Sequence, residues 1–155
     1  MKKIITLAKW IVVMLVVSIS LIPTSSAYAA SCYRASCNNR DPYVTGCAGG
    51  GASWRVLDMR YIYHYATGAN IGYVQLWWSD TCQTNWARVV STSGPKYIKA
   101  YLYNNGGEAS SIFSSGSQNV VIGTMQNGYN ILWGACGAMS DVYAAHASGS
   151  CTPMH

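Results

Sequence analysis

The sequence predicts an all-β fold: a small antiparallel β-sandwich or barrel-like domain with an irregular, disulfide-stapled N-terminal region. Short segments rich in Tyr, Trp, Val and Ile recur between clusters of Gly and Asn, which is typical of antiparallel strands joined by turns. Within several of these segments apolar and polar residues alternate, so one face is suited to a core. Six cysteines in 155 residues supply an even number for disulfide bonds.

Residues 1–29 have the three parts of a secretory signal peptide. Three lysines precede an apolar run at 10–22, and small residues follow up to position 29, where we expect cleavage. The run is shorter than the roughly 20 residues of a spanning helix, which disfavours an uncleaved anchor. A lipid anchor on Cys32 is disfavoured because the aliphatic residue expected three positions earlier is missing. We therefore expect residues 30–155 to form a single secreted domain, extracellular or wall-associated and not membrane-spanning when mature.

The charge balance disfavours nucleic acid as a partner. Ten Lys and Arg against five Asp and Glu give a formal charge of +5. Lys2, Lys3 and Lys9 lie in the expected signal peptide, so seven basic residues face five acidic ones in the mature chain. This small surplus is not clustered as the binding of several phosphates or of an anionic lipid surface requires. With half of its residues apolar, the chain is expected to fold.

All the cysteines follow the expected cleavage point, in a compartment where disulfides persist. We expect three bridges, with Cys136 paired to Cys151 and the other four cysteines paired among themselves. A zinc site is the alternative, but export opposes free thiolates and no Cys-x-x-Cys pair occurs. We therefore expect no metal and no other cofactor. The cysteines are Cys32, Cys37, Cys47, Cys82, Cys136 and Cys151.

Seven candidate strands follow the N-terminal region. Residues 31–51 are rich in Cys, Asn, Gly and Ser and are expected to be irregular. The Asn127-Gly128 pair indicates a hairpin between the strands on either side of it. The serine-rich stretch 110–117 is expected to be a loop or a weak edge strand. The expected strands are 55–65, 73–79, 86–91, 96–103, 120–125, 130–136 and 142–147.

Alternation predicts which side chains face the core. In 96–103 the aliphatic residues occupy one face and the tyrosines the other, so the tyrosines are expected to face solvent. In 73–79 the two adjacent tryptophans must point in opposite directions. We expect Trp78 to pack inside and Trp77 to face outward.

Five outward aromatic residues are the candidate ligand-binding set. Flat rings match the apolar face of a sugar, and contiguous exposed aromatic residues often mark binding surfaces. Ordinary packing between rings on neighbouring strands is the alternative reading. The partner expected for the set is a cell-wall polymer or an extracellular glycan. The set is Tyr73, Trp77, Tyr97, Tyr101 and Tyr103.

The run at 76–89 resembles the YjfA-type family, a group of exported proteins of Gram-positive bacteria with a domain of unknown function. Its specific part is the element Ser-x-x-Cys-x-x-x-Trp-Ala-Arg at 79–88, and the resemblance spans roughly residues 32–103. Relatives often have Arg-Tyr before the Ser, where this chain has two tryptophans. The resemblance implies an extracellular, cysteine-bridged domain and no particular activity. Within the element we expect structural roles for Ser79, Trp86 and Arg88.

The sequence gives less support for an active site than for a binding surface. His64 and Asp58 share a candidate strand, but six residues of regular strand place them about 20 Å apart. The motif of a nucleophile elbow or of a zinc protease does not occur. The leading hypothesis is therefore a secreted, non-catalytic binding or structural module. A hydrolase acting on wall or extracellular polymer is the alternative, and an antibacterial or toxin-like factor is a third possibility.

Overall fold

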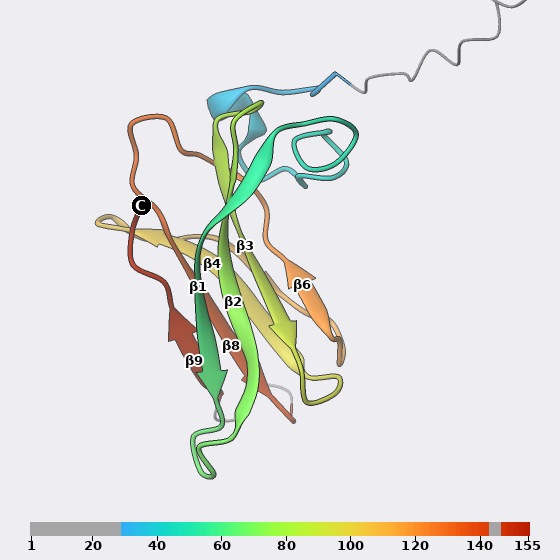
Figure 1. Ribbon diagram of the computed structural model, residues 1–155, viewed down its shortest axis with the longest axis vertical. Coiled ribbons are helices and arrows are strands. Elements are labelled where there is room, and N and C mark those ends of the chain that lie inside the picture. Colours follow the sequence, from blue (N-terminus) through green and yellow to red (C-terminus); the bar gives the residue numbers. More distant parts are fainter. Residues whose placement is uncertain (1–28, 143–146) are drawn as a thin grey trace, which may run out of the picture.

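The computed structural model describes residues 29–142 and 147–155, which form two antiparallel sheets packed as a sandwich (Figure 1). The predicted fold class is confirmed. One sheet has the order β1-β2-β3-β6, with β7 also paired to β3, and the other has the order β5-β4-β8-β9. The elements are η1 (Arg34–Cys37), β1 (Trp54–Tyr63), β2 (Asn70–Ser79), β3 (Thr84–Ser91), β4 (Tyr97–Asn104), β5 (Gly107–Phe113), β6 (Val120–Ile122), β7 (Gln126–Asn127), β8 (Gly134–Ser140) and β9 (Ser148–Cys151).

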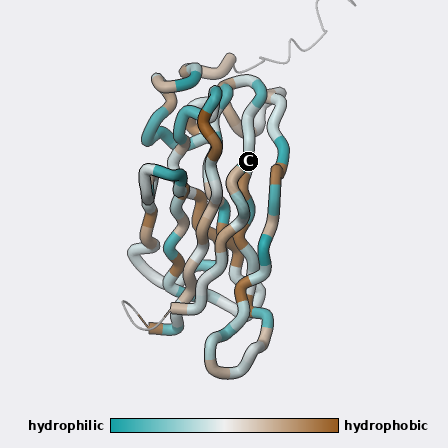
Figure 2. The backbone as a smooth tube through the Cα atoms, turned by 90° about the vertical axis from the view of Figure 1, so that its left-hand side faces the viewer, coloured by the Kyte–Doolittle hydropathy of each residue, from teal (hydrophilic) through white to brown (hydrophobic). Residues whose placement is uncertain are grey.

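The core lies between the sheets. Side chains alternate along each strand, so each sheet turns one aliphatic face towards the other. Figure 2 shows apolar stretches within the strands along the middle of the molecule. The faces predicted for 96–103 are confirmed, since the aliphatic residues of β4 are buried. The fully buried contributors include Val74, Leu76, Ala87, Val89, Ile98, Ala100 and Leu102.

The N-terminal region is irregular apart from the single 3-10 turn η1, as expected. It lies at one end of the long axis, and the turn between β1 and β2 lies at the other (Figure 1). Three disulfides are present, and their pairing agrees with the expected grouping. They are Cys32–Cys37, Cys47–Cys82 and Cys136–Cys151.

The hairpin predicted at Asn127-Gly128 is wrong. Both β6 and β7 pair with β3, and β8 begins only at Gly134. Gly128 is needed for close packing, because a Cβ there would lie 2.5 Å from Cζ3 of Trp78 and 2.1 Å from Oδ1 of Asn85. The glycine therefore permits the approach of a loop to the first sheet, and the local turn signal was misread.

Other expected elements differ at their ends. The serine-rich stretch contributes to the edge strand β5. Trp78 is half-buried at the end of β2 rather than packed inside, and its Nε1 donates to Asp80. The strand expected at 142–147 falls mostly on residues 143–146, outside the described part of the chain. The expected signal peptide also lies outside it, apart from Ala29. Among the described residues, no helix is long and apolar enough to cross a membrane.

Candidate functional site

The five aromatic residues of the predicted binding set lie on two opposite surfaces. Tyr73 and Trp77 are on the outer side of β2, because Val74 and Leu76 of the same strand face the core. The three tyrosines of β4 are on the outer side of the second sheet. The set therefore does not form a single platform. A sandwich points the outer faces of its two sheets away from each other.

The outer face of the first sheet carries a continuous group of aromatic and apolar side chains. Cross-strand neighbours pair Tyr61 with Tyr73 and Val56 with Trp77. The five members on β1 have exposed fractions between 37% and 55%. We call this surface the aromatic face, and it consists of Trp54, Val56, Met59, Tyr61, Tyr63, Tyr73 and Trp77.

A β-bulge in β1 makes this surface possible. The register shifts between Val56 and Asp58, so one extra residue enters β1 opposite β2. Val56 before the bulge and Met59 after it consequently lie on the same face, although their spacing is odd. Regular alternation would place them on opposite faces, so sequence reasoning missed the β1 members. The register of β1 with β2 shows that these residues share one face.

Three tryptophans form a row across the first sheet, at the end that packs against the N-terminal region. The ring centroids of Trp54 and Trp77 are 4.7 Å apart, and those of Trp77 and Trp86 are 6.0 Å apart in a stacked arrangement. Trp86 is fully buried in the cluster that includes the cysteines of the N-terminal region. Trp77 packs against this cluster while Trp54 remains more than a third exposed. The accessible ring of the row is therefore that of Trp54.

Polar groups lie beside the row. Oε1 of Gln75 accepts hydrogen bonds from Nε1 of Trp77 at 3.1 Å and from Nη1 of Arg88 at 2.9 Å. The guanidinium of Arg88 is 5.9 Å from the ring centroid of Trp77. Arg88 thus contacts Trp77, whereas Asp80 pairs with Arg55. These contacts hold the Trp77 ring and place one cationic group at the margin of the aromatic face.

Ser79 joins the end of β2 to the N-terminal region. Its buried Oγ donates to the backbone carbonyl of Cys47 at 2.9 Å and accepts from the backbone N–H of Cys82 at 3.2 Å. The disulfide Cys47–Cys82 connects the same two segments. These contacts place Ser79 at the connection between β2 and the N-terminal region.

The outer face of the second sheet uses its rings in contacts within the chain. Nζ of Lys99 lies 4.5 Å from the ring centroid of Tyr101, and the hydroxyl of Tyr103 donates to the carbonyl of Thr152. Lys99 also pairs with Glu108 at 2.8 Å, and this hydrogen bond lowers the pKa of Glu108. A charged pair and a bonded hydroxyl make this surface more polar than the aromatic face.

The pair His64 and Asp58 is not brought together. Asp58 instead faces Nε2 of His155 at 3.0 Å and Nε of Arg60 at 3.7 Å. His64 follows β1, in the turn that leads to β2, where its Nδ1 accepts the backbone N–H groups of Ala66 and Thr67 at 3.3 Å. The ring of His64 therefore caps this turn.

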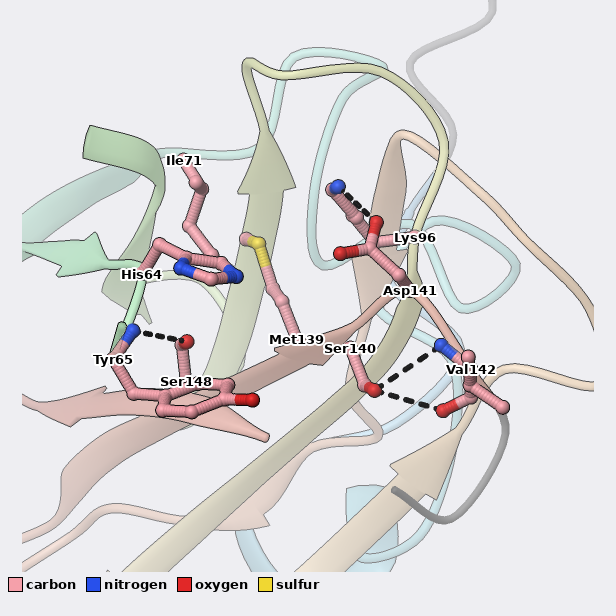
Figure 3. A pocket seen from close by; sticks show the side chains of 9 residues that line it. All are labelled: His64, Tyr65, Ile71, Lys96, Met139, Ser140, Asp141, Val142 and Ser148. Carbon is pink, nitrogen blue, oxygen red and sulfur yellow. Dashed lines mark hydrogen bonds and ion pairs between the residues drawn. The ribbon is translucent and has the colours of Figure 1, made fainter. Parts of the chain in front are cut away.

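A cavity of about 160 Å³ lies beside His64, at the end of the sandwich that carries the turn between β1 and β2 (Figure 3). His64 lies next to Met139, and Lys96 pairs with Asp141 across the cavity. That hydrogen bond lowers the pKa of Asp141. Ser148 accepts the backbone N–H of Tyr65 at 3.0 Å. Ser148, Lys96 and Asp141 are thus bonded to partners other than the imidazole of His64, so the described part of the lining does not show the serine–histidine contact that nucleophilic catalysis uses.

A second cavity, of about 290 Å³, opens at the other end of the sandwich. Its lining includes Trp78 and Arg55 from the first sheet and the exposed Leu132 from the loop before β8. The Nε1 of Trp78 and the guanidinium of Arg55 both bind Asp80, and the hydrogen bond from Trp78 is the first cause that lowers the pKa of Asp80. Two polar groups of this lining, the indole N–H of Trp78 and the guanidinium of Arg55, are therefore bound to Asp80.

Comparison of the chain with known proteins returns no match to any family model, curated protein or solved structure.

Proposed function

We propose that this protein is an extracellular, non-catalytic binding module whose aromatic face binds a polysaccharide of the cell wall or of its surroundings. The observation that carries the proposal is the half-exposed group of rings on the outer side of β1 and β2. Monomeric proteins rarely expose large contiguous apolar patches unless the patch has a binding role.

The chemistry of the surface suits a pyranose polymer. The rings of Trp54, Tyr61 and Tyr63 present apolar planes on an extended strand, and two of them carry hydroxyl groups that can exchange hydrogen bonds with sugar hydroxyls. The members of the aromatic face have no ionised side chain at neutral pH, and Arg88 at its margin is cationic. This combination fits a neutral or anionic glycan better than a basic protein.

The location outside the cell rests on three supports. Three disulfides are stable in an oxidising compartment. The N-terminal residues have the composition of a secretory signal peptide. The resemblance to the YjfA-type family of exported Gram-positive proteins points to the same place.

The test is retention on insoluble polymer. Purified protein is incubated with isolated Gram-positive cell wall, and the bound fraction is measured over a range of wall concentrations. Loss of two rings in the double variant Trp54→Ala/Tyr61→Ala is expected to weaken binding about five- to 150-fold, because each ring contact contributes about 0.5–1.5 kcal/mol. Both residues are exposed on the edge strand β1, so the fold should persist.

Tyr101→Ala is the matched control, since it removes a ring from the outer face of the opposite sheet. It should retain wall binding, and thermal unfolding should confirm that all variants are folded. Equal retention of wild type and Trp54→Ala/Tyr61→Ala would refute the proposed surface. Release of soluble sugar products that disappears with His64→Gln would instead support the hydrolase alternative, and self-association without glycan would identify the aromatic face as a contact between copies.

A further inference from the structure

Three sulfur atoms of the N-terminal region and one from the turn between β2 and β3 lie in one buried group. The Sγ atoms of Cys32, Cys37, Cys47 and Cys82 are all within 4.8 Å of one another. Although two disulfides connect them in pairs, Sγ of Cys47 is also 3.7 Å from that of Cys32 and 3.9 Å from that of Cys37. Three of the four residues are fully buried, and Cys32 is 9% exposed. The two bridges thus form one four-sulfur cluster.

The spacing of this cluster matches a tetrahedral metal site. A Zn²⁺ ion bound to four thiolates at about 2.3 Å places the sulfur atoms about 3.8 Å apart along each edge of the tetrahedron. Two of the four distances between sulfurs of different bridges, 3.7 and 3.9 Å, already agree with that edge, and the other two do not exceed 4.8 Å. After reduction, the formerly bonded partners must separate to reach it.

Backbone contacts that are independent of the bridges hold the cysteine-bearing segments together. The backbone N–H of Arg34 donates to the carbonyl of Cys82 at 2.7 Å. The hydroxyl of Ser79 ties Cys47 to the turn that carries Cys82. Breaking the sulfur bonds leaves these hydrogen bonds available, so the four thiols have a framework that keeps them close.

The surroundings of the four sulfurs provide a buried hydrogen-bond donor for thiolates. Nε1 of Trp86, which packs in this cluster, is the one buried side-chain nitrogen or oxygen without a hydrogen-bond partner among the described residues. Metal-bound thiolates accept such hydrogen bonds from neighbouring groups.

We propose that reduction of the two disulfides turns this cluster into a four-thiolate site for Zn²⁺. A dithiol gives each disulfide two electrons and two protons and itself becomes a disulfide, whereas a phosphine gives two electrons and becomes the phosphine oxide, with water supplying the oxygen and the two protons. Either reaction yields two thiols per bridge. Binding of Zn²⁺ then releases four protons and leaves a complex with a net charge of −2. The reduced N-terminal region is in this way held by a metal ion.

The experiment uses the full protein carrying Cys136→Ala and Cys151→Ala, so that all remaining thiols belong to the cluster. The protein is reduced with a phosphine without oxygen, freed of the phosphine, and titrated with Co²⁺ and then Zn²⁺. We expect one Co²⁺ per chain with the visible absorption of tetrahedral thiolate coordination, and its loss when Zn²⁺ replaces Co²⁺. The oxidised protein should show no such absorption.

The further variant Cys37→Ser/Cys82→Ser is expected to weaken Zn²⁺ binding at least a hundredfold, because it removes half of the ligands. Circular dichroism of the reduced protein with and without Zn²⁺ should show the metal restoring the signal of the oxidised fold. Unchanged affinity in Cys37→Ser/Cys82→Ser, a stoichiometry other than one, or no tetrahedral spectrum would overturn the proposal. Glycan retention is measured on the oxidised protein, so it is tested separately.

Discussion

Gly137 offers a direct test of how the two sheets pack. It faces the core from β8, and a Cβ at this position would lie 2.7 Å from Cγ2 of Val89 and 3.1 Å from Cβ of Val74 on the opposite sheet. Both valines are fully buried, and their branched side chains have little rotamer freedom. We expect Gly137→Ala to lower the free energy of unfolding by about 1–3 kcal/mol through overpacking.

A second substitution should relieve this strain. Val89→Ala removes the two methyl groups closest to the new Cβ, and alone it should cost about 2 kcal/mol of lost apolar burial. In the double variant Gly137→Ala/Val89→Ala the new methyl group occupies part of the vacated space. The double variant should therefore be more stable than the sum of the single effects predicts, by at least about 0.5 kcal/mol.

Urea unfolding followed by tryptophan fluorescence, with the disulfides intact, measures all four proteins. Gly116→Ala is the control, because a Cβ there has no atom within 4 Å, and it should be neutral or slightly stabilising. Additive effects of the two core substitutions, or a Gly137→Ala protein as stable as wild type, would show that these strands do not pack as described.

Three other predictions concern stability. Hydrogen bonds to Asp80, first that from Trp78, hold the pKa of Asp80 below its ordinary value of 3.8, so its contribution is present above about pH 4 and is lost as the pH falls through the folded-state pKa. The stability difference between wild type and Asp80→Asn should thus be full at neutral pH and shrink in acid; a constant difference would contradict this. Removing the bridge Cys136–Cys151, with its sequence separation of 15, should cost about 3 kcal/mol in urea unfolding, and no loss would disprove its stabilising role. Leu76 is fully buried, so Leu76→Ala should lower the free energy of unfolding by about 2–5 kcal/mol in the same measurement. A smaller loss would show that Leu76 does not lie in the core.

Strand alternation was the part of the sequence that predicted the structure best. The burial of Ile98, Ala100 and Leu102 follows from the period of two in a β-strand. The period holds here because the pairing of β4 with β8 contains no bulge. The same rule does not hold across β1, where the bulge at Val56 and Asp58 shifts the faces by one residue. A bulge depends on which strand pairs alongside, and that partner cannot be read from β1 itself.

Turn chemistry was a weaker guide for the same reason. Asn127-Gly128 has the composition of a tight hairpin, but β6 and β7 pair with β3, whereas β8 pairs with β4 and β9 in the other sheet. The ring of Trp78 lies so close to Gly128 that a Cβ at this position would clash with it. The requirement for Gly at this position comes from a contact between segments distant in the chain.

The sequence by itself determined the strand-rich class, the separate pairing of Cys136 with Cys151 and the inward aliphatic faces, because these depend on residue type and on spacing along one segment. Only the tertiary structure decided that the predicted rings divide between two outer surfaces, that β1 adds its own rings to one of them, and that four sulfur atoms converge. Convergence requires the relative placement of segments that are remote in sequence, and the packing of the sheets sets that placement.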